Sequence, residues 1–221
     1  MTRKYWEWKA PFEIKPEETA LIIVDMQKGF ADETGALFTP QAKEQIPVMV
    51  KLKKYCNDHN IPVFLSAFAQ SEDFHHEFYW FRNEERGLLN EDGSEKLNTK
   101  SDDAEITEAL APRDDVDDVY FQKYTYSCFA KTDLEEQLKK RGIKTLIITG
   151  TVSSWCVDST IRDAYHKDYN VVAVPDAISA YPHAGASEDQ WNNMLFNLWA
   201  EGFGRVVPSD EVIEELEKNK K

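Results

Sequence analysis

The fold is decided by the stretch Lys-Thr-Leu-Ile-Ile-Thr-Gly-Thr-Val-Ser-Ser-Trp-Cys-Val-Asp-Ser, residues 144–159. It opens with a short apolar run, Leu146 to Ile148, typical of a strand buried on both faces of a parallel sheet. Gly150 ends the run, and a helical pattern begins after Cys156. A cysteine between a strand and a helix lies near the helix's positive end, where free N–H groups lower a thiol pKa and stabilise an oxyanion. Cys156 is therefore a candidate nucleophile; the alternative is a buried structural cysteine.

Working outward from this stretch, strand patterns alternate with helical patterns along most of the chain. This alternation predicts an α/β fold with a doubly wound parallel sheet. The other expected strands are 19–24, 62–67, 119–122, 170–174 (closed by Pro175) and 205–207. Expected helices run from Pro47 to about Asp58, from a Thr132/Glu135 capping box to Gly142, after Cys156, from a Ser187/Gln190 cap to Gly202, and from Ser209 onward.

The chain has 221 residues, which suits one domain over 1–221 with a sizeable core. Residues 1–18 form an N-terminal arm, rich in aromatic side chains, that we expect to pack on the body or on a neighbouring subunit. Residues 68–117 are expected to form a long loop insertion without a clear strand. Within it, His75 and His76 are candidates for metal or substrate binding, although adjacent histidines point in different directions. An aromatic cluster at 79–81 could line a pocket or a subunit contact.

Composition narrows the class of protein. The formal net charge of −14 argues against nucleic acid as a partner, because no basic stripe is present to meet phosphates. No stretch is long and apolar enough for a membrane span, and we expect a soluble, cytoplasmic protein. Three cysteines without C-x-x-C spacing suit a reducing compartment and make no recognisable zinc site. Of these, Cys56 lies on a helical stripe and is expected to be core.

Two charged residues stand at the ends of other strands: Asp25 after the first and Lys123 after the third. The carboxyl ends of neighbouring parallel strands meet at one edge of a sheet, so both can lie beside Cys156. Asp25 can take the thiol proton, protonate a leaving amine and activate water, while Lys123 favours the thiolate and holds the carboxylate. The N–H groups of Val152 and Cys156 are the candidate oxyanion donors. A plain Lys–Asp salt bridge is the alternative for this pair.

The segments Ile-Ile-Val-Asp-Met-Gln around Asp25, Phe-Gln-Lys-Tyr-Thr-Tyr-Ser-Cys-Phe around Lys123 and Gly-Thr-Val-Ser-Ser-Trp-Cys-Val around Cys156 resemble the three motifs of the isochorismatase-like cysteine hydrolases. The resemblance implies a three-layer α/β/α fold with a six-stranded parallel sheet, a triad of these three residues and no cofactor. It also implies a cis peptide bond at Thr151–Val152 that shapes the oxyanion hole. Homo-oligomers, dimers or tetramers, are common in the family and are expected here.

The sequence departs from some branches of that family. Nicotinamidases carry an Asp-x-His metal pattern after the second strand, where this chain reads Ser-Ala-Phe-Ala-Gln at 66–70, so no metal is expected. Members that cleave a vinyl ether typically lack the cysteine, so Cys156 favours hydrolysis of an amide or ureide. Residues near the motifs are candidates for binding the small-molecule substrate; they are Gln27, Phe30, Tyr126 and Trp155, of which Trp155 could instead be core.

Four hypotheses about function follow. The leading one is a cysteine-dependent hydrolase that cleaves a C–N bond of a small amide, ureide or carbamoyl compound through a thioester-type intermediate. The second is an isochorismatase-type enol ether hydrolase that uses Asp25 and leaves Cys156 a bystander. The third is a non-catalytic member that binds a ligand or a partner. The fourth is a redox role for Cys156, with Cys128 as the nearest candidate partner.

Overall fold

The computed structural model describes residues 3–220, apart from the side chain of Trp80. Its centre is a sheet of six parallel strands in the order β3-β2-β1-β4-β5-β6, which confirms the predicted doubly wound α/β fold. The strands are β1 Thr19–Val24, β2 Val63–Phe68, β3 Asp118–Lys123, β4 Thr145–Gly150, β5 Asn170–Ile178 and β6 Arg205–Val206.

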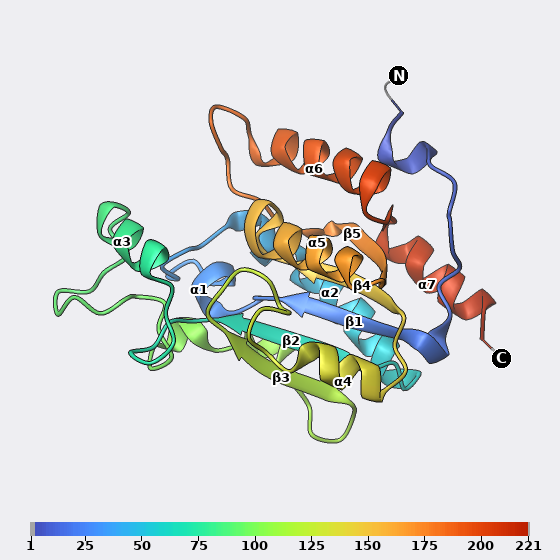
Figure 1. Cartoon of the computed structure of the whole chain (residues 1–221), viewed down its shortest axis with the longest axis horizontal. Helices are drawn as coiled ribbons and strands as arrows, with labels where there is room; N and C mark the ends of the chain where they lie inside the picture. The colour runs from blue at the N-terminus through green and yellow to red at the C-terminus, as the bar shows by residue number, and fades with distance from the viewer. Residues whose placement is uncertain (1–2, 221) are drawn as a thin grey trace.

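Helices cover both faces of the sheet and make the three layers (Figure 1). On one face, α2 and α7 pack through Met49, Leu52 and Leu216 onto Leu21 and Ile23 of β1. On the other face, a second apolar cluster joins the alternate residues of β1 to α4, α5 and α6. The helices are α1 Lys28–Ala31, α2 Pro40–Asp58, α3 Glu77–Glu85, α4 Leu134–Lys140, α5 Asp158–His166, α6 Glu188–Gly202 and α7 Ser209–Lys218.

The two central strands carry no polar face, since every residue of β1 and of β4 is buried. They pair in register from Thr19 with Thr145 to Val24 with Gly150, so their carboxyl ends lie side by side. Gly150 has φ of +110°, and a Cβ there would stand 2.1 Å from the carbonyl oxygen of Val24. Glycine is therefore required at the point where β4 turns into the loop that follows it.

Two predicted element boundaries and one predicted cap were wrong. Helix α2 begins at Pro40, not Pro47, because both prolines suit a first turn and only Pro40 follows an extended residue. Strand β5 continues through Pro175 to Ile178, because an irregular register with β4 accommodates a residue that has no N–H. The predicted capping box at α4 is absent: the Thr132 hydroxyl donates to the Cys128 carbonyl, and Glu135 pairs with lysines instead.

The predicted insertion at 68–117 is not all loop, because it contains α3 and two short 3-10 turns. Figure 1 shows α3 and its loops projecting beyond the edge of the sheet toward which the arrows of β1, β2 and β3 point. The segment also forms a small core of its own with the loops after β1 and β4, through Phe30, Phe68, Tyr79, Leu97 and Val152. It therefore covers the carboxyl edge of the sheet.

The N-terminal arm lies on the body, which was one of its two predicted positions. The Tyr5 ring meets the Phe196 ring of α6 at 5.8 Å, and Arg205 donates a hydrogen bond to the Phe12 carbonyl. Trp6 keeps 62% of its surface exposed. The first two residues of the predicted arm lie outside the described part of the chain.

Candidate active site

The carboxyl edge of the sheet holds a buried ion pair. The Nζ of Lys123, the last residue of β3, lies 2.7 Å from the Oδ2 of Asp25, the first residue after β1. Both side chains are fully buried. Lys123 also donates to the Thr125 carbonyl at 3.1 Å and lies 5.0 Å from the centre of the Phe68 ring. Burial works to lower the pKa of Lys123, but the facing Asp25 carboxylate, together with Cys156 and Cys128, outweighs it and raises that pKa, which keeps the amine charged.

Asp25 is held in place from β2 as well. Its φ is +50°, a left-handed conformation that aspartate tolerates better than most residues. The hydroxyl of Ser66 donates to Asp25 Oδ1 at 2.7 Å and accepts from the Asp25 N–H at 3.1 Å. Ser66 is itself fully buried in β2. The carboxylate thus receives one donor on each oxygen, and its position is fixed by three adjacent strands.

Cys156 lies beside this pair, in a π-helical turn, Ser153–Val157, that leads from β4 into α5. Only 4% of the residue is exposed, and both Asp25 and Lys123 act on its thiol. Burial raises its pKa well above the usual value, the charge of Lys123 opposes that rise, and Asp25 adds to it. The expectation of a lowered thiol pKa was therefore wrong, because removal from water outweighs the helix end and the lysine.

The turn between β4 and the cysteine has the backbone form that the family resemblance implied. The Thr151–Val152 peptide bond is cis. Neighbouring N–H groups are engaged: Ser153 donates to the Ser179 carbonyl, and Trp155 and Val157 donate to the Val152 carbonyl.

A cavity of about 440 Å³ opens above Cys156. Its wall is largely apolar and aromatic, which suits a small organic ligand. Among the described side chains, the lining residues are Phe30, Ala36, Leu37, Phe38, Phe68, Tyr79, Arg86, Leu88, Tyr126, Val152, Trp155, Cys156, Tyr181 and His183.

Three of the four residues predicted to bind substrate line this cavity: Phe30, Tyr126 and Trp155. Trp155 thus forms part of the wall, with its ring edge-on to Tyr126 at 5.2 Å. Gln27, the fourth, is not among the lining residues. Its amide is fully buried and bonded to the Phe68 N–H and carbonyl and to the Asp103 carbonyl, so it ties the loop after β1 to the end of β2 and to the insertion.

The sequence analysis missed Ser66 and several residues that line the cavity. Tyr79 and Arg86 come from the insertion, and Tyr181 and His183 come from the loop after β5. The aromatic cluster at 79–81 was a usable signal for Tyr79, although Phe81 is 63% exposed and the side chain of Trp80 lies outside the described structure. Nothing periodic marked the others.

His75 and His76 do not line the cavity; His75 Nδ1 lies 3.3 Å from the Ser71 carbonyl oxygen, and the His76 N–H donates to Gln70. Within the described residues, no three His, Cys, Asp or Glu side chains gather in a way that could hold a metal ion. None of the described helices has the length and apolar character needed to span a membrane.

Comparison with known proteins places these features in a family. A family model of the isochorismatase domain matches residues 19–210. The chain is 30% identical over 205 residues to enterobactin synthase component B of Escherichia coli, a match that covers 93% of this chain and 66% of that protein. It therefore spans about two thirds of that relative's length.

The chain is also similar to two proteins that are named as hydrolases. The chain is 28% identical over 204 residues to the ureidoacrylate amidohydrolase RutB of Pseudomonas savastanoi, which covers 85% of this chain and 80% of that protein. The solved structure of a cysteine hydrolase from Pseudomonas syringae matches with a TM-score of 0.83 at 32% identity, covering 95% of this chain and 97% of the other.

Proposed function

The chain belongs to the isochorismatase family of hydrolases, and we propose that it cleaves a C–N bond of a small amide, ureide or carbamoyl compound with Cys156 as nucleophile. One observation carries the proposal: Cys156 lines an aromatic cavity large enough for such a substrate, and its thiol is under the influence of the buried Asp25–Lys123 pair. The pair can exchange a proton with the thiol, and the cavity can bring a carbonyl carbon to it.

In the first half-reaction, the thiol proton moves to Asp25 as the sulfur attacks the substrate carbonyl carbon. The carbonyl π electrons move onto oxygen, and the N–H groups of Val152 and Cys156 would bind that oxyanion. The tetrahedral intermediate then collapses. The C–N bond breaks as Asp25 returns its proton to the nitrogen, and ammonia or an amine leaves an acyl- or carbamoyl-cysteine.

In the second half-reaction, Asp25 takes a proton from water while the water oxygen attacks the thioester-type carbon. Collapse breaks the C–S bond, releases the acid and returns the proton to the sulfur. Lys123 stays in place, because it donates hydrogen bonds to Asp25 and to the Thr125 carbonyl, and its raised pKa keeps it charged. Its charge stabilises the carboxylate and the transient thiolate in turn.

The amidohydrolase and cysteine hydrolase relatives support this proposal over the enol ether alternative. In that alternative Asp25 alone would transfer a proton and Cys156 would have no role. We keep it as a second candidate because enterobactin synthase component B is also similar to this chain. A homo-oligomer and a cytoplasmic location stay predictions from the sequence.

The test is a panel of amides, N-carbamoyl compounds and isochorismate, assayed for released ammonia and for ether cleavage. The Cys156→Ala variant is compared with Cys56→Ala, a cysteine buried in the opposite core cluster. We expect ammonia release that falls at least about a thousandfold in Cys156→Ala and persists in Cys56→Ala. Ammonia release that persists in Cys156→Ala would contradict the assignment of Cys156 as the nucleophile. Ether cleavage that is indifferent to this substitution would favour the second candidate.

A further inference from the structure

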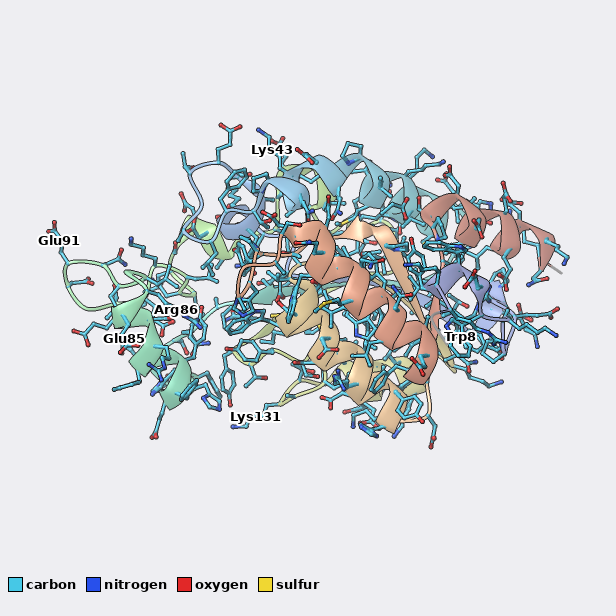
Figure 2. All side chains as sticks on the ribbon, turned by 90° about the horizontal axis from the view of Figure 1, so that it is seen from above. Trp8, Lys43, Glu85, Arg86, Glu91 and Lys131 are labelled. Atoms are coloured by element: carbon cyan, nitrogen blue, oxygen red, sulfur yellow. The ribbon has the colours of Figure 1, made fainter. Side chains whose placement is uncertain are left out.

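Helix α6 carries apolar side chains on two of its sides. Phe196 and Trp199 face inward and are buried in the core cluster beneath the helix. On the outer side Met194 and Leu198, one turn apart, keep 52% and 44% of their surface exposed; we call this pair the α6 stripe. Figure 2 looks down on this side of the molecule and shows α6 in front, with none of the described elements lying across it. The helix therefore has a second apolar face that its own chain leaves uncovered.

The α6 stripe lies in a stretch without charge. The eleven residues 190–200 contain no Asp, Glu, Lys or Arg, although 30% of the chain is charged. The half-buried Trp191 and Leu195 belong to the same stretch. Depletion of charged residues, together with enrichment in Met and aromatic residues, is the composition of an interface core. The stretch ends at Glu201, which is exposed and forms no ion pair with any described residue.

The N-terminal arm lies beside the same helix and presents a large aromatic side chain. The Tyr5 ring holds the arm there, 5.8 Å from the Phe196 ring of α6. The next residue, Trp6, is 62% exposed, and Figure 2 shows Trp8 beside the C-terminal end of α6. Because Trp6 and the α6 stripe both stay open to solvent, the arm does not cover the stripe of its own chain. Tryptophan is among the residues that most often anchor an interface.

The arm is a basic segment in an acidic chain. Arg3, Lys4 and Lys9 are exposed, and none of them forms an ion pair with a described carboxylate. Glu7 is the one acid between them, and its carboxylate accepts the Lys4 N–H at 2.6 Å. The chain as a whole has a formal net charge of −14. The arm therefore matches Glu201 at the end of α6 in charge and the α6 stripe in apolar character.

We propose that α6 and the N-terminal arm together form a surface that binds a second copy of this chain, with Trp6 of each copy against the α6 stripe of the other. A two-fold axis that runs between the arm and the stripe makes both contacts at once, because an isologous interface repeats every contact. The same arrangement brings the basic arm of one copy toward the exposed Glu201 of the other. The surface does not include Cys156, so this inference does not depend on the proposed reaction.

Two other occupants fit this surface less well. A membrane with anionic lipids would attract the arm, but it would repel the remainder of a chain whose net charge is −14. A basic protein would find no acidic side chain to pair with in residues 190–200. A second copy needs neither, because the stripe is uncharged and the arm brings its own cations.

The first experiment measures association of the whole chain by sedimentation velocity at about 1 to 100 μM. We expect Trp6→Ala and Met194→Lys each to raise the dissociation constant at least about 10-fold, because one removes an aromatic anchor and the other places an unpaired charge in the contact. A dimer should then become a monomer, and a larger oligomer should lose the step that this surface makes.

Phe81→Ala and Tyr120→Lys are the matched controls, since these residues are 63% and 46% exposed but lie in α3 and β3. Both should associate as the wild type does. A wild type that is monomeric at about 100 μM, test variants that associate like the wild type, or an equal loss in the controls would each overturn the proposal.

Cross-linking tests whether the contact joins two different chains. Trp6→Cys and Met194→Cys chains, one of them carrying a tag, are mixed and treated with a bis-maleimide; the three natural cysteines are buried. We expect a cross-linked dimer with one chain of each kind, and none when Phe81→Cys replaces Trp6→Cys. If that dimer is absent, or if the chain binds vesicles of phosphatidylserine and phosphatidylcholine in a way that Trp6→Ala abolishes, a second copy is not the occupant.

Discussion

Replacing Lys123 by methionine should destabilise the fold strongly, because it leaves the Asp25 carboxylate buried without its counter-charge. The two charges lie 2.7 Å apart and are both fully buried. At an effective dielectric constant of about 20 their attraction is roughly 6 kcal/mol, part of which offsets the cost of burying them. Removing one partner of such a pair costs about 3–5 kcal/mol in the free energy of unfolding. The Ser66 hydroxyl would remain to donate a hydrogen bond to the carboxylate.

The measurement is urea unfolding at neutral pH for the wild type, Lys123→Met and the double variant Asp25→Asn/Lys123→Met. The double variant removes both charges, and asparagine tolerates the φ of +50° at position 25. It should recover at least about 2 kcal/mol of the loss, because an uncharged amide is cheaper to bury than a carboxylate. If Lys123→Met costs under about 1 kcal/mol, or the double variant is no more stable than the single one, the pair is not the buried ionic contact described above.

Two predictions concern other parts of the fold. Burial raises the pKa of Glu95, which is 2% exposed in the insertion, to about 7, while His75 opposes the rise. The protonated Glu95 carboxyl contributes its full stability below about pH 4.5, and this contribution is lost as pH rises through about 7. The Glu95→Gln variant should therefore show a smaller fall in Tm between about pH 5 and 8 than the wild type. The control Glu91→Gln, at an exposed residue, should show the same fall as the wild type. Gly150→Ala should lower the free energy of unfolding in urea by more than about 4 kcal/mol, because the new Cβ would lie 2.1 Å from the Val24 carbonyl oxygen. Gly142 also has a positive φ, +68°, but open space around it, so Gly142→Ala should lower that free energy by about 1 kcal/mol. A similar loss at both glycines would refute the steric argument.

The three residues of the proposed triad could be placed from the sequence because each follows from strand position. Asp25 and Lys123 stand at the carboxyl ends of β1 and β3, and Cys156 comes six residues after the end of β4. A parallel sheet brings such ends to one edge whatever the loops do. The start of α2 was not predictable in the same way, since Pro40 and Pro47 satisfy the same first-turn rule and the choice depends on tertiary packing.

The cavity wall could not be read from the sequence for a related reason. Arg86, Tyr181 and His183 belong to connections, where no period of 2 or 3.6 links a residue to a face, and Tyr79 lies in α3, a short helix that was predicted as loop. The wrong expectation for the Cys156 pKa has a different origin. Position relative to a helix end is visible in a sequence, but the depth of burial that decides the pKa is a property of the whole packed chain.

That raised pKa changes how the site must work. A thiol with a high pKa is protonated at neutral pH, so Cys156 is not a standing thiolate like those of many reactive cysteines. Lys123 is already engaged by Asp25 and the Thr125 carbonyl, so its charge serves the carboxylate before it serves the sulfur. In the proposed mechanism the thiol proton moves to Asp25, and this transfer becomes favourable as sulfur electrons enter a bond with the substrate carbon. Under the proposed function, burial would then restrict the thiol to electrophiles that the cavity positions, so the cavity wall would decide which compounds react.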